Sequence, residues 1–147
     1  MSTYRRVLLV LDLNEDSATV GRRGVALAKA VGAEIELLHV VEFVPVEPMG
    51  ETIMPAVQIE NELLDRATSR LRGMAAELGI PDAPCHVEAG NVKSEIVRIA
   101  RERRADLIVL GSRERHGLSI LVNLTEDTVL HAAPCDVLAV RVGPPHR

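Results

Sequence analysis

Apolar residues in this chain form short continuous runs that alternate with longer stretches of helical spacing. Runs rich in Val, Leu and Ile are typical of strands, and a run that is apolar throughout indicates burial on both faces. They predict five strands, at residues 7–11, 34–41, 85–88, 106–110 and 136–142, the fourth ending at Gly111. The stretches between them predict helices from Asn14 or Asp16 to about residue 31 and over residues 56–78, 95–104 and 119–131.

Helical spacing also shows which side of each helix should meet the sheet, because residues three or four positions apart share one face. In the longest predicted helix this face carries Ile59, Leu63, Ala67, Leu71, Met74 and Leu78. The residues before that helix, 42–55, contain Pro45, Pro48, Gly50 and Pro55, and they are predicted to form a loop.

Strands that alternate with helices predict an α/β domain with a parallel sheet, right-handed crossovers and helices on both faces. The expected strand order is 3-2-1-4-5, and the length suits a single domain over residues 1–147. In such a sheet, ligands bind beyond the carboxyl ends of the strands, at the switch point between strands one and four. Residues 11–13 and 111–117 meet there, and the second segment leads into a helix amino terminus, which favours an anion.

Composition narrows the possible partners. Hydrophobic residues make up 47% of the chain but aromatic residues only 1%, so the core must be aliphatic and stacking on nucleic-acid bases is unsupported. The formal net charge of -4 also argues against nucleic acid as a partner. No apolar run approaches the ~18 residues of a membrane helix, so we expect no membrane association and a cytoplasmic location. Cys85 and Cys135 form no metal-ligand spacing, and no metal site is expected.

Several short motifs coincide with the predicted strands and the loops that follow them. They are V-L-L-V-L-D at residues 7–12, L-L-H-V-V at 37–41, A-D-L-I-V-L-G-S at 105–112, G-S-R-E-R-H-G-L at 111–118 and V-L-H-A-A-P-C-D-V-L-A-V at 129–140. With these motifs the chain resembles the universal stress protein family over nearly its whole length. The resemblance implies a flavodoxin/Rossmann-like three-layer sandwich with a five-stranded parallel sheet.

Some members of that family bind ATP, with a signature that resembles G-x-x-G, nine further residues, and G-[ST]. Gly111 matches the first glycine, but Glu114 stands at the second position. Counting forward from Glu114 places the last pair at Leu124 and Thr125, whereas counting back from the last motif places it at Asn123 and Leu124. Neither count gives a glycine, and only the forward count retains a hydroxyl group.

Glutamate at position 114 brings a carboxylate to the place where phosphates would lie. At ~4 Å and an effective dielectric constant of ~20, two like charges repel by about 4 kcal/mol. Arg113, Arg115 and His116 offset part of that repulsion. The resemblance therefore implies that ATP binding is weak or absent. If a site for ATP or AMP is retained, the nucleotide-binding residues are Asp12, Val40, Gly111, Arg113, Arg115, His116, Gly117, Asn123 and Thr125.

Several of these positions also have a purely structural interpretation. Asp12 matches the nucleotide-facing aspartate of ATP-binding members, or it is a loop residue bonded to local backbone. Val40 corresponds to a backbone contact with adenine, and its side chain is expected in the core. Residues 90–92 resemble a G-x-P turn, or form only a tight strand-to-helix turn. His39, inside an apolar strand, is expected to be a hydrogen-bonded core histidine.

The last predicted strand would lie at an edge of the sheet. It carries one internal charge, Arg141, and exposed apolar edges favour pairing with another chain. Members of the resembled family form dimers through this strand, which implies a homodimer; the alternative is a monomer whose edge is covered by residues 143–147. The predicted interface residues are Val137, Leu138, Ala139, Val140, Arg141 and Val142.

No nucleophile elbow, H-E-x-x-H motif or P-loop occurs, so we expect no enzyme activity. The first hypothesis is a non-catalytic stress-adaptation protein, a dimeric module that binds an unidentified protein partner. The second is an ATP- or AMP-responsive regulator that uses Arg113, Arg115 and Thr125 in a modified phosphate loop. The third is a flavin-binding or nucleotidyl-transfer enzyme on a related fold, but the chain shows neither a flanking aromatic nor a catalytic pair.

Overall fold

A computed structural model describes residues 3–42, 53–113 and 129–142 of the chain. In these ranges strands and helices alternate as predicted, and residues 129–132 are helical. The predicted fourth helix otherwise lies outside the described residues. The elements are β1 (Arg6–Val10), α1 (Ser17–Val31), β2 (Glu34–Val41), α2 (Ile53–Glu77), β3 (Cys85–Ala89), α3 (Val92–Glu102), β4 (Leu107–Arg113) and β5 (Asp136–Val142).

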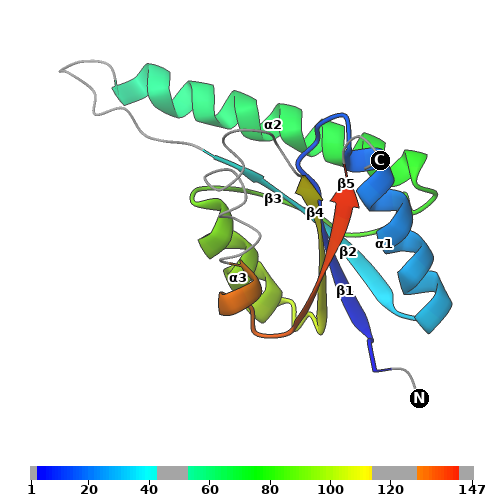
Figure 1. Ribbon diagram of the computed structural model, residues 1–147. Helices are drawn as coiled ribbons and strands as arrows, with labels where there is room; N and C mark the ends of the chain where they lie inside the picture. The colour runs from blue at the N-terminus through cyan, green and yellow to red at the C-terminus, as the bar shows by residue number, and fades with distance from the viewer. Residues whose placement is uncertain (1–2, 43–52, 114–128, 143–147) are drawn as a thin grey trace.

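The five strands form one parallel sheet in the order β3-β2-β1-β4-β5, which confirms the predicted order. β1 lies in the middle, with Val7 opposite Ile35 of β2 on one side and opposite Leu107 of β4 on the other. Because the chain moves outward from β1 in one direction and then returns to add β4 and β5, the strand order reverses between β1 and β4 (Figure 1).

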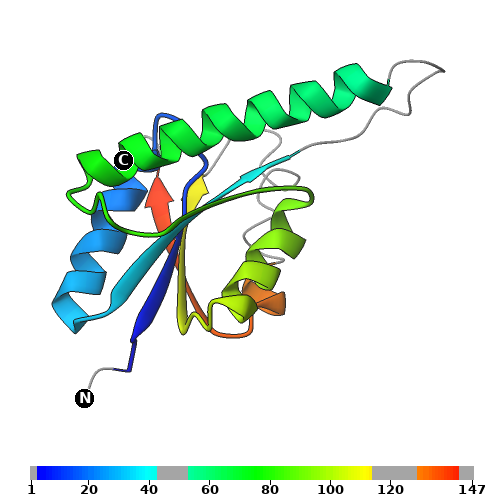
Figure 2. The same ribbon diagram turned by 180° about the vertical axis from the view of Figure 1, so that it is seen from behind.

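Alternate residues of the central strand point into two separate cores. Val7 and Leu9 of β1 pack with α1 and α2, whereas Leu8 and Val10 pack with α3. Both views show α1 and α3 on opposite faces of the sheet (Figures 1 and 2). This three-layer arrangement explains why β1 reads as a continuous apolar run: both of its faces are covered.

Two residues of α2 that helical spacing assigned to the inner face are exposed, and that prediction is wrong. Ile59 is 54% exposed and Leu63 38% exposed, whereas Ala67 and Leu71 of the same stripe are buried. A helix of 25 residues is about 37 Å long, but β3, the neighbouring edge strand, has 5 residues and spans only about 17 Å. The amino-terminal part of α2 therefore projects past the sheet (Figures 1 and 2).

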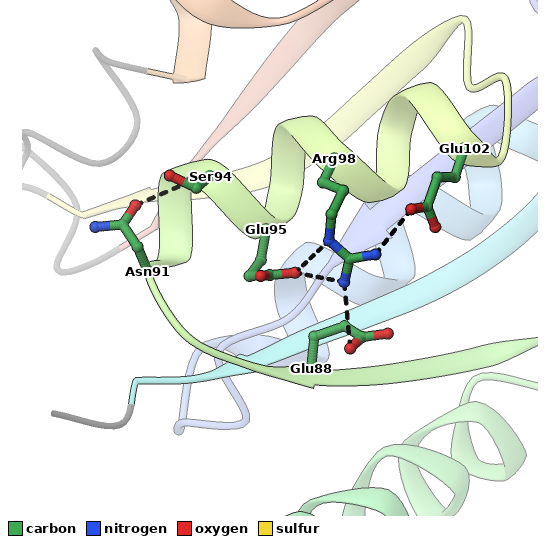
Figure 3. Close-up of polar contacts among 6 residues, drawn as sticks. All are labelled: Glu88, Asn91, Ser94, Glu95, Arg98 and Glu102. Atoms are coloured by element: carbon green, nitrogen blue, oxygen red, sulfur yellow. Dashed lines mark hydrogen bonds and ion pairs between the residues drawn. The ribbon is translucent and has the colours of Figure 1, made fainter. Parts of the chain in front are cut away.

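Two helices begin earlier than the sequence predicted. α2 starts at Ile53, so Pro55 lies in its first turn, where the missing N–H has no helical partner to lose. α3 starts at Val92, because the side chain of Asn91 accepts a hydrogen bond from the Ser94 backbone N–H at 3.0 Å and caps the helix (Figure 3). Gly90, with φ at 145°, makes the turn from β3, which agrees with the structural interpretation of residues 90–92.

A four-residue ion-pair network fastens α3 to the edge strand β3. The Arg98 guanidinium on α3 lies 3.3 Å from the carboxylate of Glu88 on β3, and it also pairs with Glu95 at 2.5 Å and Glu102 at 2.9 Å (Figure 3). The hydrogen bonds that Arg98 donates to the carboxylates of Glu95 and Glu102 raise the pKa of Arg98 above its usual value. This network lies at the β3 edge of the sheet, where β2 separates it from β1.

Candidate functional site

The carboxyl ends of β1 and β4 come together at the switch point of the sheet, as predicted. Asp12 from the loop after β1 and Gly111 from β4 line the same small cavity, of about 30 Å³. The tip of β5 reaches the same edge of the sheet (Figure 1), and its Val142 lines this cavity too. A cavity of that size holds about one water molecule, so the described residues alone form no nucleotide-sized pocket at the switch point.

The loop after β1 has an unusual backbone conformation. Leu13, the residue after Asp12, has φ at 58°, in the left-handed region that side chains other than Asn and Asp rarely adopt. Such a conformation costs on the order of 1–3 kcal/mol. The Leu13 side chain is only 6% exposed, and burying a leucine contributes about 1.5–3 kcal/mol, so its burial offsets the strain.

Side chains from β2 and α2 bind the backbone of this loop. His39 of β2 donates from Nδ1 to the carbonyl oxygen of Leu11 at 2.7 Å, and Arg70 of α2 donates to the carbonyl oxygen of Leu13. Leu11 also donates its own N–H to the carbonyl of Leu38 at 2.9 Å. The prediction that His39 is hydrogen-bonded is confirmed, although its side chain is half-buried rather than fully enclosed.

The start of α1 is fixed by Asn14 and Ser17. The side-chain oxygen of Asn14 accepts from the Asp16 N–H at 2.9 Å, and the buried Ser17 hydroxyl accepts from the Asn14 N–H at 3.1 Å. Asp16 stands at the cap position of α1 but makes no side-chain capping bond. Of the two predicted caps, Asp16 thus holds the position while Asn14 supplies the side-chain bond.

Gly111 has a packing role in the sheet, and its role in nucleotide binding stays a prediction. β4 does not end there but continues to Arg113, with Gly111, Ser112 and Arg113 paired to β5. Its backbone is not in the left-handed region, and a Cβ at this position would lie 3.0 Å from Cγ2 of Val20 in α1. The missing side chain therefore allows α1 to pack closely on β4, independently of any phosphate.

The other predicted nucleotide-binding positions divide between the core and the undescribed part of the chain. Val40 is buried and packs in the core beneath α3, as expected for its side chain. Arg113 belongs to β4 by its backbone, and its side chain lies outside the described residues. Also outside them are Glu114, Arg115, His116, Gly117, Asn123 and Thr125.

β5 is an edge strand, as predicted, and pairs with β4. Leu138 is 39% exposed, and Ala139 and Arg141 are exposed too, while Val137 and Val142 are half-buried. Val140 points into the core between α1 and the sheet. Of the predicted interface residues, Val140 can therefore contribute only its backbone.

Neither cysteine has the character of a nucleophile. Burial raises the pKa of the Cys85 thiol, and burial together with nearby carboxylates, Asp136 first among them, raises the pKa of the Cys135 thiol. A raised pKa keeps a thiol protonated at neutral pH, and the protonated form is unreactive.

Within residues 3–42, 53–113 and 129–142, no three His, Cys, Asp or Glu side chains gather as metal ligands. Over the same ranges, no helix combines the length and the apolar character needed to cross a bilayer.

Sequence reasoning placed Leu13 at the switch point but missed its left-handed backbone, and it missed Arg70 altogether. Arg70 occupies the exposed face of an amphipathic helix, where an arginine is ordinary, and the backbone angle of Leu13 has no counterpart in its residue type. No local pattern in the sequence pointed to the Leu13 conformation or to the contact made by Arg70.

Comparison with known proteins identifies the family. The model of the universal stress protein family matches residues 3–141. This chain belongs to the universal stress protein family. It is 35% identical over 144 residues to universal stress protein A homolog 2 of Coxiella burnetii, covering 97% of this chain and 98% of the relative.

Solved structures of universal stress proteins share the fold. Universal stress protein UspA from Lactobacillus plantarum matches with a TM-score of 0.80 at 20% identity, covering 96% of this chain and 100% of that one. A universal stress protein in complex with cAMP matches with a TM-score of 0.61 at 20% identity, covering 95% of this chain and 98% of that one. At these identities the likeness shows the flavodoxin-like architecture and no more.

Proposed function

We propose that this universal stress protein is a non-catalytic, cytoplasmic stress-adaptation protein that acts as a homodimer and binds another protein. Its binding of adenine nucleotides is weak or absent. The observation that carries this proposal is the exposed, largely apolar edge strand β5.

Strand β5 has the properties of a pairing surface. An edge strand presents unpaired backbone N–H and C=O groups, and monomeric proteins usually protect such an edge with charges or a covering element. Here the outward side chains include Leu138 and Ala139, and Arg141 is the one charged residue between positions 137 and 142. Two copies related by a twofold axis would pair this strand with itself, which closes the assembly at a dimer.

One feature supports weak nucleotide binding. Glu114 places a carboxylate in the segment that would hold phosphates. A site of this kind favours a role in which protein contacts, rather than a bound nucleotide, transmit the signal.

Sedimentation velocity at micromolar concentration tests the dimer. We expect the unmodified protein to sediment as a dimer and Leu138→Arg to sediment as a monomer, because a charge on the pairing strand must be desolvated in the interface. Leu130→Arg is the matched control: Leu130 is 56% exposed but lies outside β5, so this variant should remain dimeric. A monomeric unmodified protein, or a dimer that survives Leu138→Arg, would remove the basis of the proposal.

The second candidate function is an adenine-nucleotide-responsive regulator. It is favoured by the shared cavity of Asp12 and Gly111 and by the fold-level likeness to a universal stress protein in complex with cAMP. In this candidate, Arg113, Arg115 and Thr125 replace the missing glycines in holding the phosphates of ATP or AMP. Direct titration with nucleotides separates the two candidates, since only the second requires affinity in the micromolar range.

A further inference from the structure

The loop between β1 and α1 is held on both sides of Asp12 by donors from other elements. His39 of β2 donates to the carbonyl of Leu11, the residue before Asp12, at 2.7 Å. Arg70 of α2 donates to the carbonyl of Leu13, the residue after it. The positions of the two carbonyl groups that flank Asp12 are thus set by β2 and α2, not by the loop itself.

These two bonds act on a backbone that is strained. Leu13 has φ at 58° and its side chain is buried, so the loop adopts a conformation that a leucine seldom takes in isolation. A strained conformation persists only where several surrounding contacts fix it, and such places are enriched at functional sites. Here the contacts are the two donors and the buried Leu13 side chain.

The bond from His39 defines the tautomer of its imidazole. A carbonyl oxygen only accepts hydrogen bonds, so Nδ1 of His39 must carry a proton. In the neutral ring, Nε2 is then unprotonated. The tautomer of His39 can therefore be measured, and it does not depend on any bound ligand.

We propose that His39 and Arg70 are positioning residues for Asp12. They hold the loop between β1 and α1 in one conformation at the switch point. An adenine nucleotide would then bind next to a carboxylate that is already ordered, and binding would not include the free-energy cost of ordering the loop. The binding part of this inference rests on the second candidate function. The ordering part does not.

Two substitutions of His39 test the ordering directly. In His39→Asn the side-chain NH₂ lies near the place of Nδ1 and can still donate to the Leu11 carbonyl, whereas in His39→Gln the donor lies near the place of Nε2. We expect the backbone amide of Asn14 to exchange with solvent about tenfold faster or more in the Gln variant and at the unmodified rate in the Asn variant. Arg70→Met, which keeps the aliphatic stem without the donor, should also accelerate exchange.

The unmodified protein provides a readout that does not depend on whether any variant folds. A ¹⁵N spectrum of the neutral histidine side chains should show His39 protonated on Nδ1 and unprotonated on Nε2. The opposite tautomer, or equal amide exchange in the Asn and Gln variants, would overturn the proposal.

Calorimetric titration with cAMP and with ATP adds the binding readout. If the unmodified protein binds either nucleotide, His39→Gln should weaken the affinity about tenfold while His39→Asn does not, at matched thermal stability. Equal loss in both variants would contradict a positioning role. If the unmodified protein binds neither nucleotide, the second candidate function fails, and the tautomer and exchange measurements still decide whether His39 orders the loop.

Discussion

Gly111 lies where β4 packs against Val20 of α1, and its packing role follows from that contact. The sequence motif suggested a phosphate-binding glycine, but the nearest atom to its absent Cβ is Cγ2 of Val20, at 3.0 Å. The motif therefore predicted correctly that Gly111 lies at the switch point. It did not reveal the physical reason for a glycine at this position. The packing reason operates whether or not a nucleotide binds.

We expect Gly111→Ala to lower the free energy of unfolding by about 1–3 kcal/mol, because the added methyl group would press on Cγ2 of Val20, whose β-branched side chain has little rotamer freedom in a helix. Urea denaturation measures the change. The matched control is Gly73→Ala on the exposed side of α2, where nothing lies within 4 Å of the added atom. That variant should gain roughly 0.5–1 kcal/mol from the better helix propensity of alanine. Equal effects in the two variants would contradict the packing role.

The residues around Asp12 show which contacts can be predicted from the sequence and which cannot. His39 was expected to be hydrogen-bonded because a histidine in an apolar strand needs a partner, and the structure provides the Leu11 carbonyl. That partner is 28 positions away in the sequence, and Arg70 lies 57 positions from the carbonyl that it binds. Contacts across such separations depend on how whole elements pack, so a pattern read from neighbouring residues does not reveal them.

Helix α2 shows that the burial of a helical face, too, cannot be predicted from local sequence alone. Its periodicity correctly predicted a helix and correctly placed Ala67 and Leu71 in the core, but Ile59 and Leu63 of the same stripe are exposed. Whether a helical face is covered depends on the length of the strands beneath it. The 5-residue strand β3 is too short to cover a 25-residue helix, and helical spacing contains no information on that mismatch.

Alanine substitutions along α2 should reflect this difference. Leu71 is 0% exposed, so Leu71→Ala should cost about 2–5 kcal/mol of folding free energy through lost burial and the cavity left behind. Leu63→Ala on the projecting part should cost less than about 1 kcal/mol. Thermal or urea unfolding of the two variants compares them directly. A large cost at Leu63 would show that this part of α2 is covered in solution.

The architecture of the molecule was the most predictable level. Continuous apolar runs and alternating elements led to a parallel sheet of order 3-2-1-4-5 with helices on both faces, and this is the observed fold. The rules that connect strands through right-handed crossovers leave few alternatives once the element order is known. The exact end of β4 was not predictable, because pairing with β5 extends it through Gly111 to Arg113.

At the scale of the whole molecule, we propose that a universal stress protein with Glu114 in its predicted phosphate-binding segment works without tight nucleotide binding. The most direct test is calorimetric titration of the unmodified protein with ATP and Mg²⁺, with Glu114→Gly measured in parallel. A loss of a few kcal/mol moves a micromolar affinity toward millimolar, so we predict no saturable binding of micromolar ATP by the unmodified protein. Micromolar binding by the unmodified protein would contradict the account and establish a nucleotide-responsive regulator instead.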